Sequence, residues 1–184
     1  MRIIAGEFRG RRLLPPQGNQ TRPITDRAKQ SLFDILAPLI ENAVVYDCFA
    51  GTGSLGLESL SRGTKLATFF ESDRSAVGFL EKNLASLIVS DRARVVRTDI
   101  FAWFEQSPKA DEPADLVFLD PPYRYLVEQP EKLKSLATHL TRSHLKSGAT
   151  VVFRHDAADA LELPRLVRYD VREYGGMTLE FLRY

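Results

Sequence analysis

Residues 46–58 read YDCFAGTGSLGLE, and the organisation of the chain follows from this stretch. The apolar residues around its start indicate a buried strand, and a helix begins near Ser54. Between them, Gly51, Gly53 and Gly56 match the pattern G-x-G-x-x-G, in which glycines let the backbone turn tightly and approach a ligand. The first turn of the helix points free N–H groups at that ligand. The stretch therefore predicts a strand–turn–helix unit that holds a nucleoside-containing cofactor.

An acidic residue at the end of the next strand strengthens this interpretation. The strand LATFFE ends at Glu71, 20 residues after Gly51. A carboxylate at this position can accept hydrogen bonds from both hydroxyls of a ribose. Glycines alone would also fit a turn that binds nothing, but the strand, the helix and the spaced acid together favour a nucleoside site. The glycine pattern does not by itself separate NAD from S-adenosylmethionine.

From residue 43 onward the sequence alternates between strand and helix patterns. We expect strands at 43–48, 66–71, 93–99, 114–120 and 149–155, and helices at 54–62, 72–87, 100–107 and 130–146. After a short helical turn, two last strands at 166–174 and 177–184 meet at Gly175–Gly176 as a hairpin. Repeated strand–helix units imply parallel strands with helices on both faces. We therefore predict an α/β, Rossmann-like fold with a mostly parallel, seven-stranded sheet and a C-terminal antiparallel hairpin.

Composition excludes several classes of protein. At 184 residues, with 44% hydrophobic and 27% charged residues, the chain fits one ordinary globular domain. No apolar run is long enough to span a membrane, and the N-terminus has no signal-peptide pattern. The single cysteine, Cys48, favours a reducing compartment, so we expect a cytoplasmic protein. The spacing of His139, His144 and His155 predicts no metal site.

Charge is distributed unevenly along the chain. Residues 1–30 contain seven basic and two acidic residues, a net charge of +5, whereas the rest contains 18 basic and 22 acidic residues, a net charge of −4. Such asymmetry indicates either a polyanion partner or a solvated basic surface, and the charge count alone leaves both open.

The N-terminal residues differ from the rest in pattern as well. Short apolar pieces around GEFRGRR predict a small two-stranded β extension with a glycine turn, followed by a Pro-, Gly- and Asn-rich loop. Thr25 or Asp26 can then cap a helix that runs to about Ile40. One face of this helix carries Ala28, Leu32, Ile35, Leu36 and Leu39. We therefore divide the chain into a basic extension and loop, residues 1–24, and a Rossmann-like domain, residues 25–184.

The stretch FLDPPYRYL, residues 118–126, ends an apolar strand with an unusual turn. An exocyclic amine on a nucleobase is a poor nucleophile because its lone pair is delocalised into the ring. The Asp120 carboxylate and the Pro121 carbonyl can accept its two N–H groups, which turns the lone pair outward. Pro121 and Pro122 fix the backbone, and the Tyr123 ring offers a face for a base to stack on. The alternative is a structural Asx-type turn with a packed tyrosine.

Two further aspartates favour S-adenosylmethionine over NAD. Asp47 precedes the glycines at a strand end, where its charge would repel a pyrophosphate but suit the ammonium group of a methionine. Asp99 ends the third strand, where it can accept a hydrogen bond from an adenine amino group. Both aspartates lie at the carboxyl edge of the predicted sheet, together with Asp120, and ligands bind at that edge of open α/β sheets.

Several pieces of the chain together resemble one known family. The DPPY turn after a strand is similar to amino-methyltransferases that act on adenine N6, cytosine N4 or guanine N2. The whole chain resembles the RsmD family of bacterial 16S ribosomal RNA guanine-N2 methyltransferases. The matching pieces are RIIAGEFRGRRL, TRPITDRAKQSLFDIL, DCFAGTGSLGLESLSRG, FFESDRSA, the NL at 83–84 and FLDPPY. Asp34 and Cys48 depart from residues common in that family, and neither belongs to the chemistry expected here.

This resemblance implies a class I methyltransferase fold and a set of residue roles. The cofactor would be S-adenosylmethionine, and the substrate a guanine of 16S ribosomal RNA in a small subunit or its assembly intermediate. The resemblance implies that Asp47, Gly51 and Gly53 hold the methionine part, Glu71 the ribose and Asp99 the adenine. It implies that Asp120, Pro121, Pro122 and Tyr123 form the catalytic loop, with no metal. We expect a monomer, because no apolar stripe is left over.

Basic residues of the N-terminal part then become candidates for contacts with RNA phosphates. These are Arg9, Arg11, Arg12, Arg22 and Arg27. The composition of residues 15–25 further suggests a lid over the cofactor. Arg124 and Tyr125 follow the catalytic turn and could contact RNA, although exposure to solvent explains them equally well.

Rival interpretations explain only part of the sequence. Another amino-methyltransferase, such as an adenine-N6 enzyme of DNA or RNA, shares the DPPY turn. A protein-glutamine methyltransferase has Asn at the position of Asp120, and a cofactor-free RNA-binding protein explains only the basic arm. A nicotinamide oxidoreductase fits the glycines and Glu71 but leaves the DPPY turn without a role. We interpret Cys48 as a small buried residue rather than a nucleophile, Trp103 and Phe104 as core, and His155 as a solvated strand end.

Overall fold

The structure is a computed structural model, and it describes residues 1–15, 24–107 and 109–184. Its strands are β1 (Val44–Cys48), β2 (Leu66–Glu71), β3 (Ala93–Arg97), β4 (Ala114–Leu119), β5 (Leu145–Asp156), β6 (Val167–Tyr174) and β7 (Met177–Arg183). Its α-helices are α1 (Asp26–Ile40), α2 (Ser54–Ser61), α3 (Arg74–Leu87), α4 (Ile100–Gln106), α5 (Arg124–Glu128) and α6 (Pro130–Ser143), and Ser90–Arg92 form one turn of 3-10 helix.

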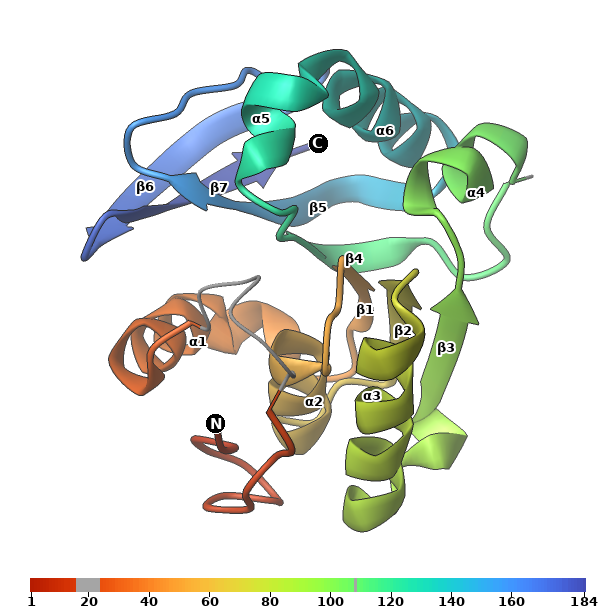
Figure 1. The fold of residues 1–184 in the computed structure, drawn as a ribbon, viewed down its shortest axis with the longest axis vertical. Helices are drawn as coiled ribbons and strands as arrows, with labels where there is room; N and C mark the ends of the chain where they lie inside the picture. The colour runs from red at the N-terminus through yellow and green to blue at the C-terminus, as the bar shows by residue number, and fades with distance from the viewer. Residues whose placement is uncertain (16–23, 108) are drawn as a thin grey trace.

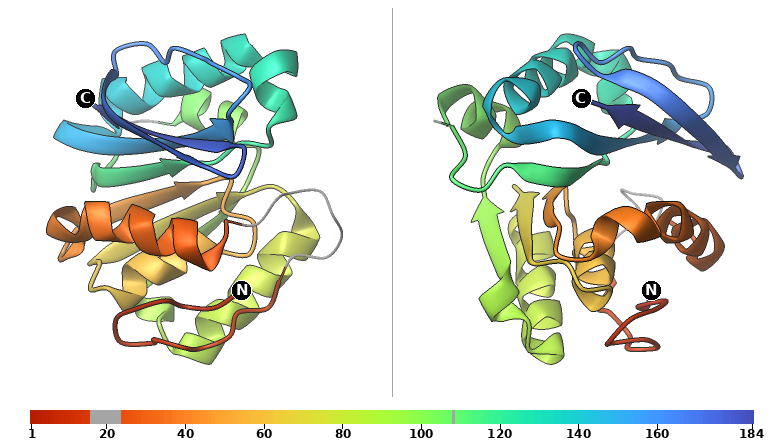
Figure 2. Two further views of the ribbon diagram at one scale, coloured as in Figure 1. Left: turned by 90° about the vertical axis from the view of Figure 1, so that its left-hand side faces the viewer. Right: turned by 180° about the vertical axis from the view of Figure 1, so that it is seen from behind.

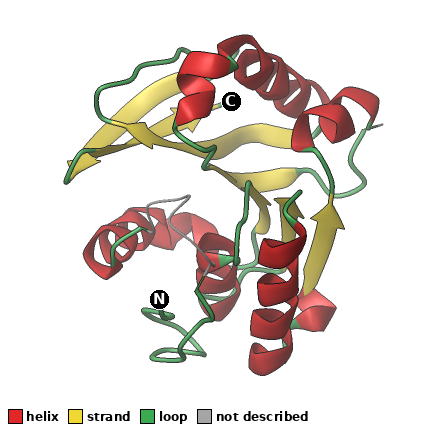
Figure 3. Ribbon diagram, in the orientation of Figure 1, coloured by secondary structure: helices red, strands yellow, loops and turns green. Residues whose placement is uncertain are grey.

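The seven strands form one sheet in the order β3-β2-β1-β4-β5-β7-β6 (Figure 1). The first five strands pair in parallel, and β7 is antiparallel to both β5 and β6. Figures 2 and 3 show helices on both faces, with α1, α2 and α3 on one side and α4, α5 and α6 on the other. The predicted Rossmann-like sheet with its C-terminal hairpin is therefore confirmed.

The core is divided by the sheet into two apolar clusters. Successive side chains of a strand point to opposite faces, so a strand covered on both sides is apolar throughout. In β1, Val45 packs against α1, α2 and α3, whereas Val44 and Tyr46 pack toward α4 and α6. The same alternation fixes the direction of each polar residue that ends a strand.

Helix α1 begins as the sequence predicts, and its buried face is slightly rotated. The Thr25 side chain accepts a hydrogen bond from Ala28 N, so Thr25 is the N-cap. Leu39, which we expected on the apolar face, is 39% exposed, while Phe33 is fully buried. Phe33 packs on Phe118 of β4, so contact with the sheet decides which residues of the helix are covered.

Between β4 and β6, the structure differs from several predicted element boundaries. Strand β5 begins at Leu145, so the preceding helix ends at Ser143 rather than at residue 146. Helix α5 directly follows the DPPY turn and was not expected. The segment between β5 and β6 contains turns rather than the expected helical turn.

The described part of the N-terminal extension, residues 1–15, folds back on itself as the sequence predicts, although its pairing is short. An antiparallel bridge joins Arg2 and Arg12, and Ile3 N donates to Arg11 O at 2.9 Å and Leu13 N to Met1 O at 3.1 Å. The extension is also bound to α2, because Ile4 N and Ala5 N donate to the Glu58 carboxylate at 2.7 and 3.0 Å. A buried carboxylate thus fixes this small element on the helical layer.

Lys29 is buried beside the same carboxylate. Its ammonium donates to Arg2 O at 2.6 Å and lies 3.5 Å from Glu58, and its side chain is 1% exposed. Burial lowers the pKa of Lys29, and the charge of Glu58 partly offsets this effect. Lys29, one of the seven basic residues among residues 1–30, is therefore part of a buried ion pair and is not available to bind a polyanion.

The edge strand β6 leaves apolar side chains on the surface. Val167, Tyr169 and Val171 are 70%, 44% and 42% exposed. The pairing register shifts between Arg168 and Asp170, so Val167 pairs with Arg183 of β7 and Val171 pairs with Glu180, and these two partners point to opposite faces. The exposed side chains therefore do not form one apolar stripe, and the monomer stays a prediction.

Two further features concern membranes and metals. In the ranges that the structure describes, none of the helices has the length and apolar character needed to cross a membrane. Among the same residues, no three His, Cys, Asp or Glu side chains lie together in a way that could hold a metal ion.

Gly6 tests how the extension is docked. A Cβ atom at this residue would lie 1.9 Å from the backbone oxygen of Ser61, and its φ is +84°. We expect Gly6→Ala to lower the free energy of unfolding by roughly 3 kcal/mol, or to release the extension, because neither backbone can yield. Urea unfolding, with hydrogen exchange at Ile4 and Ala5, measures both outcomes.

Gly10→Ala is the matched control. Gly10 has nearly the same φ, +83°, but no atom lies within 4 Å of the added Cβ. This variant should lose only about 1 kcal/mol from backbone strain. Equal losses in the two variants would contradict the close approach to Ser61.

Candidate functional site

The sheet reverses its winding direction between β1 and β4. From β1 the chain proceeds outward through β2 and β3, and then returns to place β4 and β5 on the other side. Open α/β sheets bind ligands in the crevice outside the carboxyl ends of the strands at this reversal. The glycine loop follows β1 and the DPPY turn follows β4, so the two sequence motifs flank this position.

The glycine loop combines one open position with one closed position. Gly51 and Gly53 both have positive φ values, +56° and +87°. A Cβ atom at Gly51 would meet nothing within 4 Å, whereas one at Gly53 would lie 2.5 Å from the Leu80 side chain. Gly53 is therefore required by packing against α3, and Gly51 leaves open space in which a ligand could approach the backbone.

Asp47 is a buried carboxylate at the end of β1. Its side chain accepts one hydrogen bond, from Gly56 N at 2.8 Å, and the residue is 2% exposed. Burial raises the pKa of Asp47 well above its ordinary value, the Gly56 hydrogen bond opposes this, and the charges of Asp120 and Glu71 raise the pKa further. A buried acid with a strongly perturbed pKa at a sheet edge is typical of a functional site.

Glu71 and Asp99 are both engaged with backbone N–H groups. Glu71 accepts hydrogen bonds from Gly51 N, Ser72 N and Asp73 N, each at 2.8 Å. Asp99 caps α4 and accepts a hydrogen bond from Phe101 N at 2.9 Å. Glu71 is thus tied directly to the glycine loop, whereas Asp99 lies two strands away from β1, at the end of β3. Their predicted contacts with a ribose and an adenine remain predictions.

The DPPY turn aims Asp120 at the same crevice. Asp120 N donates to Cys48 O at 3.4 Å, which ties the turn to the end of β1. Pro122 O accepts a hydrogen bond from Tyr125 N at 2.8 Å, so Pro122 opens the first turn of α5. The Asp120 side chain is 21% exposed. Burial raises the pKa of Asp120, and the charge of Arg154 lowers it in opposition.

Arg154 is the functional-site residue that the sequence analysis missed. It lies near the end of β5, with Nη1 at 2.8 Å from Asp120 Oδ2 and Nε at 3.2 Å from the Tyr123 hydroxyl. An arginine inside the apolar run VVFRH could have drawn attention to this position. The strand-pairing register, however, is needed to connect it with Asp120.

His155, next along the chain, was wrongly interpreted as a solvated strand end. It is 2% exposed, and its Nδ1 donates to Asp156 O at 2.7 Å. Its Nε2 lies 3.8 Å from Glu180 on β7. Burial lowers the pKa of His155, but Glu180 and the Asp156 carbonyl outweigh burial, so the net shift of the pKa is upward. Because β5 lies between β4 and β7, its end is covered on both sides rather than exposed.

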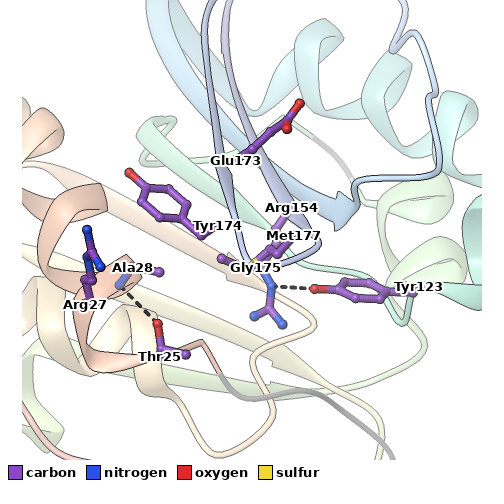
Figure 4. A pocket seen from close by; sticks show the side chains of 9 residues that line it. All are labelled: Thr25, Arg27, Ala28, Tyr123, Arg154, Glu173, Tyr174, Gly175 and Met177. Carbon is purple, nitrogen blue, oxygen red and sulfur yellow. Dashed lines mark hydrogen bonds between the residues drawn. The ribbon is translucent and has the colours of Figure 1, made fainter.

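A pocket of about 370 Å³ opens beside the DPPY turn (Figure 4). Its walls come from the start of α1, the turn of the β6–β7 hairpin, Tyr123 and Arg154. The guanidinium carbon of Arg154 lies 5.6 Å from the centroid of the Tyr123 ring, and the two side chains meet on one wall. Arg27, which we predicted as a phosphate contact, lies on the opposite wall.

The remaining basic candidates lie elsewhere. Arg9, Arg11 and Arg12 are exposed on the N-terminal extension, and Arg11 donates to Ser86 O at 2.6 Å near the end of α3. Helix α3 starts at the carboxyl edge of the sheet and runs 14 residues, so its far end lies about 20 Å from the crevice. The structure thus brings Arg27 to the pocket but does not bring Arg11 there. Arg22 lies outside the described residues, as does most of the suggested lid at 15–25.

Asn83 connects the extension with the glycine loop. Its side-chain amide accepts from Leu14 N at 2.8 Å and donates to Thr52 O at 3.0 Å, and the residue is 1% exposed. The NL pair at 83–84 is part of the resemblance to the RsmD family, which by itself gives Asn83 no physical role. The structure shows its role: the Asn83 side chain binds Leu14 of the extension and Thr52 of the glycine loop.

The residues interpreted as core are buried or nearly so. Cys48 is fully buried, and burial raises its pKa well above the ordinary value, which does not suit a nucleophile. Phe104 is buried and Trp103 partly buried, and both pack on Phe70 of β2. These predictions are confirmed.

Comparison with known proteins gives consistent results. A family model described as Conserved hypothetical protein 95 matches residues 1–183. The chain is 46% identical over 124 residues to the Ribosomal RNA small subunit methyltransferase D of Escherichia coli K12, a match that covers 67% of this chain and 61% of that protein. It is 35% identical over 168 residues to the Putative rRNA methyltransferase YlbH of Bacillus subtilis, covering 91% and 88% of the two chains. The solved structure of the putative methyltransferase yhhF from Escherichia coli is similar over 100% of this chain and 97% of its own, with 33% identity and a TM-score of 0.85.

The burial of Asp47 predicts a specific dependence of stability on pH. Because its pKa is higher in the folded than in the unfolded protein, the folded state binds the proton more tightly, and this group destabilises the fold as pH rises above its unfolded pKa. We expect Asp47→Asn to be more stable than the unchanged protein at pH 8, with a gap that closes toward pH 3. The gap should be on the order of 1.4 kcal/mol per unit of pKa difference.

Urea unfolding at several pH values measures this gap. Asp91→Asn, at an exposed residue, is the control for a change in net charge alone. Stability curves of the Asp47 variant and the unchanged protein that run parallel across this pH range would contradict the buried-carboxylate account.

Proposed function

The chain belongs to the RsmD family, and on this premise we propose that it methylates the exocyclic N2 amine of a guanine in 16S ribosomal RNA, with S-adenosylmethionine as the methyl donor. Its E. coli relative is named a small-subunit ribosomal RNA methyltransferase. The proposed substrate form is the small ribosomal subunit or an assembly intermediate of it, in the cytoplasm, and the proposed active form is a monomer.

The observation that carries this proposal is the clustering of acids at the reversal of the sheet. Asp47 and Asp120 end neighbouring strands, both pKa values are raised by burial, and the charge of Asp120 adds to the shift of Asp47. The crevice therefore has an excess of negative charge. A cationic ligand relieves it, whereas the pyrophosphate of NAD would add negative charge beside Asp47. The electrostatics therefore favour S-adenosylmethionine, which carries both an ammonium and a sulfonium group.

The residues around the glycine loop suit each part of this cofactor. Asp47 would hold the ammonium, Gly51 and Gly53 would admit the methionine part, Glu71 would bind the ribose and Asp99 the adenine. The open space at Gly51 supports this fit, since a ligand can lie against the backbone there. When bound, S-adenosylmethionine supplies a methyl group on a positively charged sulfur that leaves with the bonding electron pair.

The DPPY turn would present the amine to that methyl group. Asp120 accepts one N–H of the exocyclic amine and the Pro121 carbonyl accepts the other, so the nitrogen lone pair faces the methyl carbon. The new N–C bond leaves a surplus proton on nitrogen, and this proton passes to Asp120 or to water. Pro122 fixes the turn, and the Tyr123 ring stacks on the base.

The pocket beside Tyr123 has the character of a site for an unstacked base. Enzymes that modify bases take the target out of the helix and bind it between apolar or aromatic groups. The pocket of about 370 Å³ is lined by Tyr123, Tyr174 and Met177, with Arg27 at its wall. Arg27 can therefore bind a phosphate next to the flipped nucleotide. An adenine-N6 methyltransferase would use the same elements, and nucleoside analysis of the product separates the two activities.

The basic extension, residues 1–24, would bind RNA farther from the reacting base. The exposure of Arg9 and Arg12, on a segment whose backbone is bound to α2 at Ile4 and Ala5, supports this role. Residues 25–184 would carry the chemistry. This division describes function rather than two independently folded parts, because Glu58 and Asn83 bind the extension to the helical layer.

Asp120→Ala tests the proposed chemistry. We expect this variant to transfer methyl groups at least about 100-fold more slowly to small subunits that lack the modification, because the amine loses its acceptor. Calorimetry should show that its affinity for S-adenosylmethionine changes little, and that neither protein binds NAD. Digestion of the RNA and mass analysis should identify N2-methylguanine. Full activity of Asp120→Ala, or binding of NAD in place of S-adenosylmethionine, would contradict the proposal.

The double variant Arg9→Ala/Arg12→Ala tests the extension. Each lost phosphate contact should weaken RNA binding and reduce the slope of log affinity against log salt by about 0.7 to 0.9. Arg142→Ala, at an exposed residue on α6 across the sheet, is the matched control. Salt titration of binding to small subunits makes the measurement, and equal slopes in all three proteins would remove the extension from the RNA site.

A further inference from the structure

Arg154 is placed beside the DPPY turn by the pairing of β4 with β5. Leu119 is the last residue of β4 and pairs in parallel with Phe153. One step further along both strands lie Asp120 and Arg154, whose side chains point to the same face because alternate residues do. The Arg154 side chain is only 7% exposed. The register of the sheet thus fixes a buried cation next to the proposed catalytic carboxylate.

The contacts of Arg154 join two residues of the turn. Nη1 lies 2.8 Å from Asp120 Oδ2, and Nε donates to the Tyr123 hydroxyl at 3.2 Å. The guanidinium also lies 5.6 Å from the Tyr123 ring centroid, within the range of a cation–π contact. A single planar group therefore fixes the orientation of both side chains, which lysine could not do because its ammonium is a point charge.

We propose that Arg154 is a positioning residue for the methyl transfer, which orients Asp120 and Tyr123 toward the pocket. This inference rests on the proposed function and adds to it a residue outside the DPPY motif. Because Arg154 uses Oδ2, the other carboxylate oxygen of Asp120 can accept from the amine. The contact thereby decides which oxygen faces the pocket.

The charges around Asp120 explain why a cation is needed. From β1, the charge of Asp47 interacts unfavourably with that of Asp120, and from the same turn the Tyr123 hydroxyl contacts Arg154 rather than Asp120. From β5, Arg154 is the group that lowers the pKa of Asp120 against the effect of burial. Without it, Asp120 would take up a proton at a higher pH. A protonated carboxyl group cannot receive the proton that the amine must lose.

Two variants of Arg154 separate positioning from a merely structural role. Arg154→Met removes the charge and both hydrogen bonds, and we expect kcat to fall about 100-fold, with the affinity for S-adenosylmethionine changed less than about threefold. We expect activity to rise with pH as Asp120 loses its proton, and we expect this rise to move to higher pH in the variant because Arg154 opposes the upward shift of the Asp120 pKa. Arg154→Lys keeps the charge but not the contact with both partners, so its pH profile should move less while kcat still falls.

Arg168→Met is the matched control. Arg168 on β6 forms an ion pair with Glu180 at 2.7 Å and has no part in the DPPY turn. Its loss should affect stability but leave kcat and the pH profile unchanged. If Arg154→Met does not fold, Arg154→Lys still tests the inference through its kcat and pH profile.

The titration of Asp120 is also measured directly, without RNA or cofactor. Carbon-13 NMR of the aspartate carboxyl groups, with Asp120→Asn to assign the signal, follows this group in the unchanged protein and in the Arg154 variants. A higher pKa of Asp120 in Arg154→Met supports the inference even if the unchanged protein proves inactive on 16S RNA, a result that would overturn the proposed function alone. An unchanged pKa of Asp120, or an unchanged kcat and pH profile in Arg154→Met, overturns the inference.

Discussion

Two carboxylates on neighbouring strands, Asp47 buried and Asp120 partly buried, impose the main constraint on this molecule. The reversal of the sheet between β1 and β4 brings Asp47 and Asp120 to one edge, where burial makes their ionised forms costly. Arg154 compensates one of them, and Asp47 receives a single backbone hydrogen bond. Stability alone would favour apolar residues at both positions. Groups that cost stability and lie at the edge where open α/β sheets bind ligands are candidates for a function, which is the role proposed for both aspartates.

A buried charge also determines how the N-terminal extension packs on the helical layer behind this edge. Glu58 is fully buried, and it accepts hydrogen bonds from the backbone of the N-terminal extension while pairing with Lys29 and Arg62. A buried carboxylate with this many donors is well satisfied, unlike Asp47. Through Asn83 the extension also contacts the glycine loop. The N-terminal residues are therefore part of the support of the site, and they carry their exposed arginines on a fixed backbone.

Local patterns predicted what depends on local chemistry. The apolar runs, the glycine turn and the Thr25 cap gave the strands, the loop and the start of α1, because each is determined by a few adjacent residues. The small β element of the extension was predicted, but its attachment to α2 was not, because Glu58 lies more than 50 residues away in the sequence. The roles of Arg154 and Asn83 were missed for the same reason. Their roles come from the register of β4 with β5 and from packing of α3 on the loop, and neither is visible in neighbouring letters of the sequence.

The proposed reaction needs negative charge near the methyl donor and positive charge near the RNA, and the two kinds of charged residue lie in different parts of the molecule. The crevice must attract a cationic methyl donor, for which acids are suitable, while the substrate is a polyanion that those acids repel. Exposed arginines therefore belong at the rim and beyond: Arg27 at the wall of the pocket, and Arg9 and Arg12 on the extension. Arg154 is the exception, a buried arginine already engaged by Asp120 and Tyr123. With its charge partly neutralised by Asp120, it would offer little attraction to a phosphate, so in the proposed reaction the pocket would admit the uncharged base while the RNA backbone stays outside.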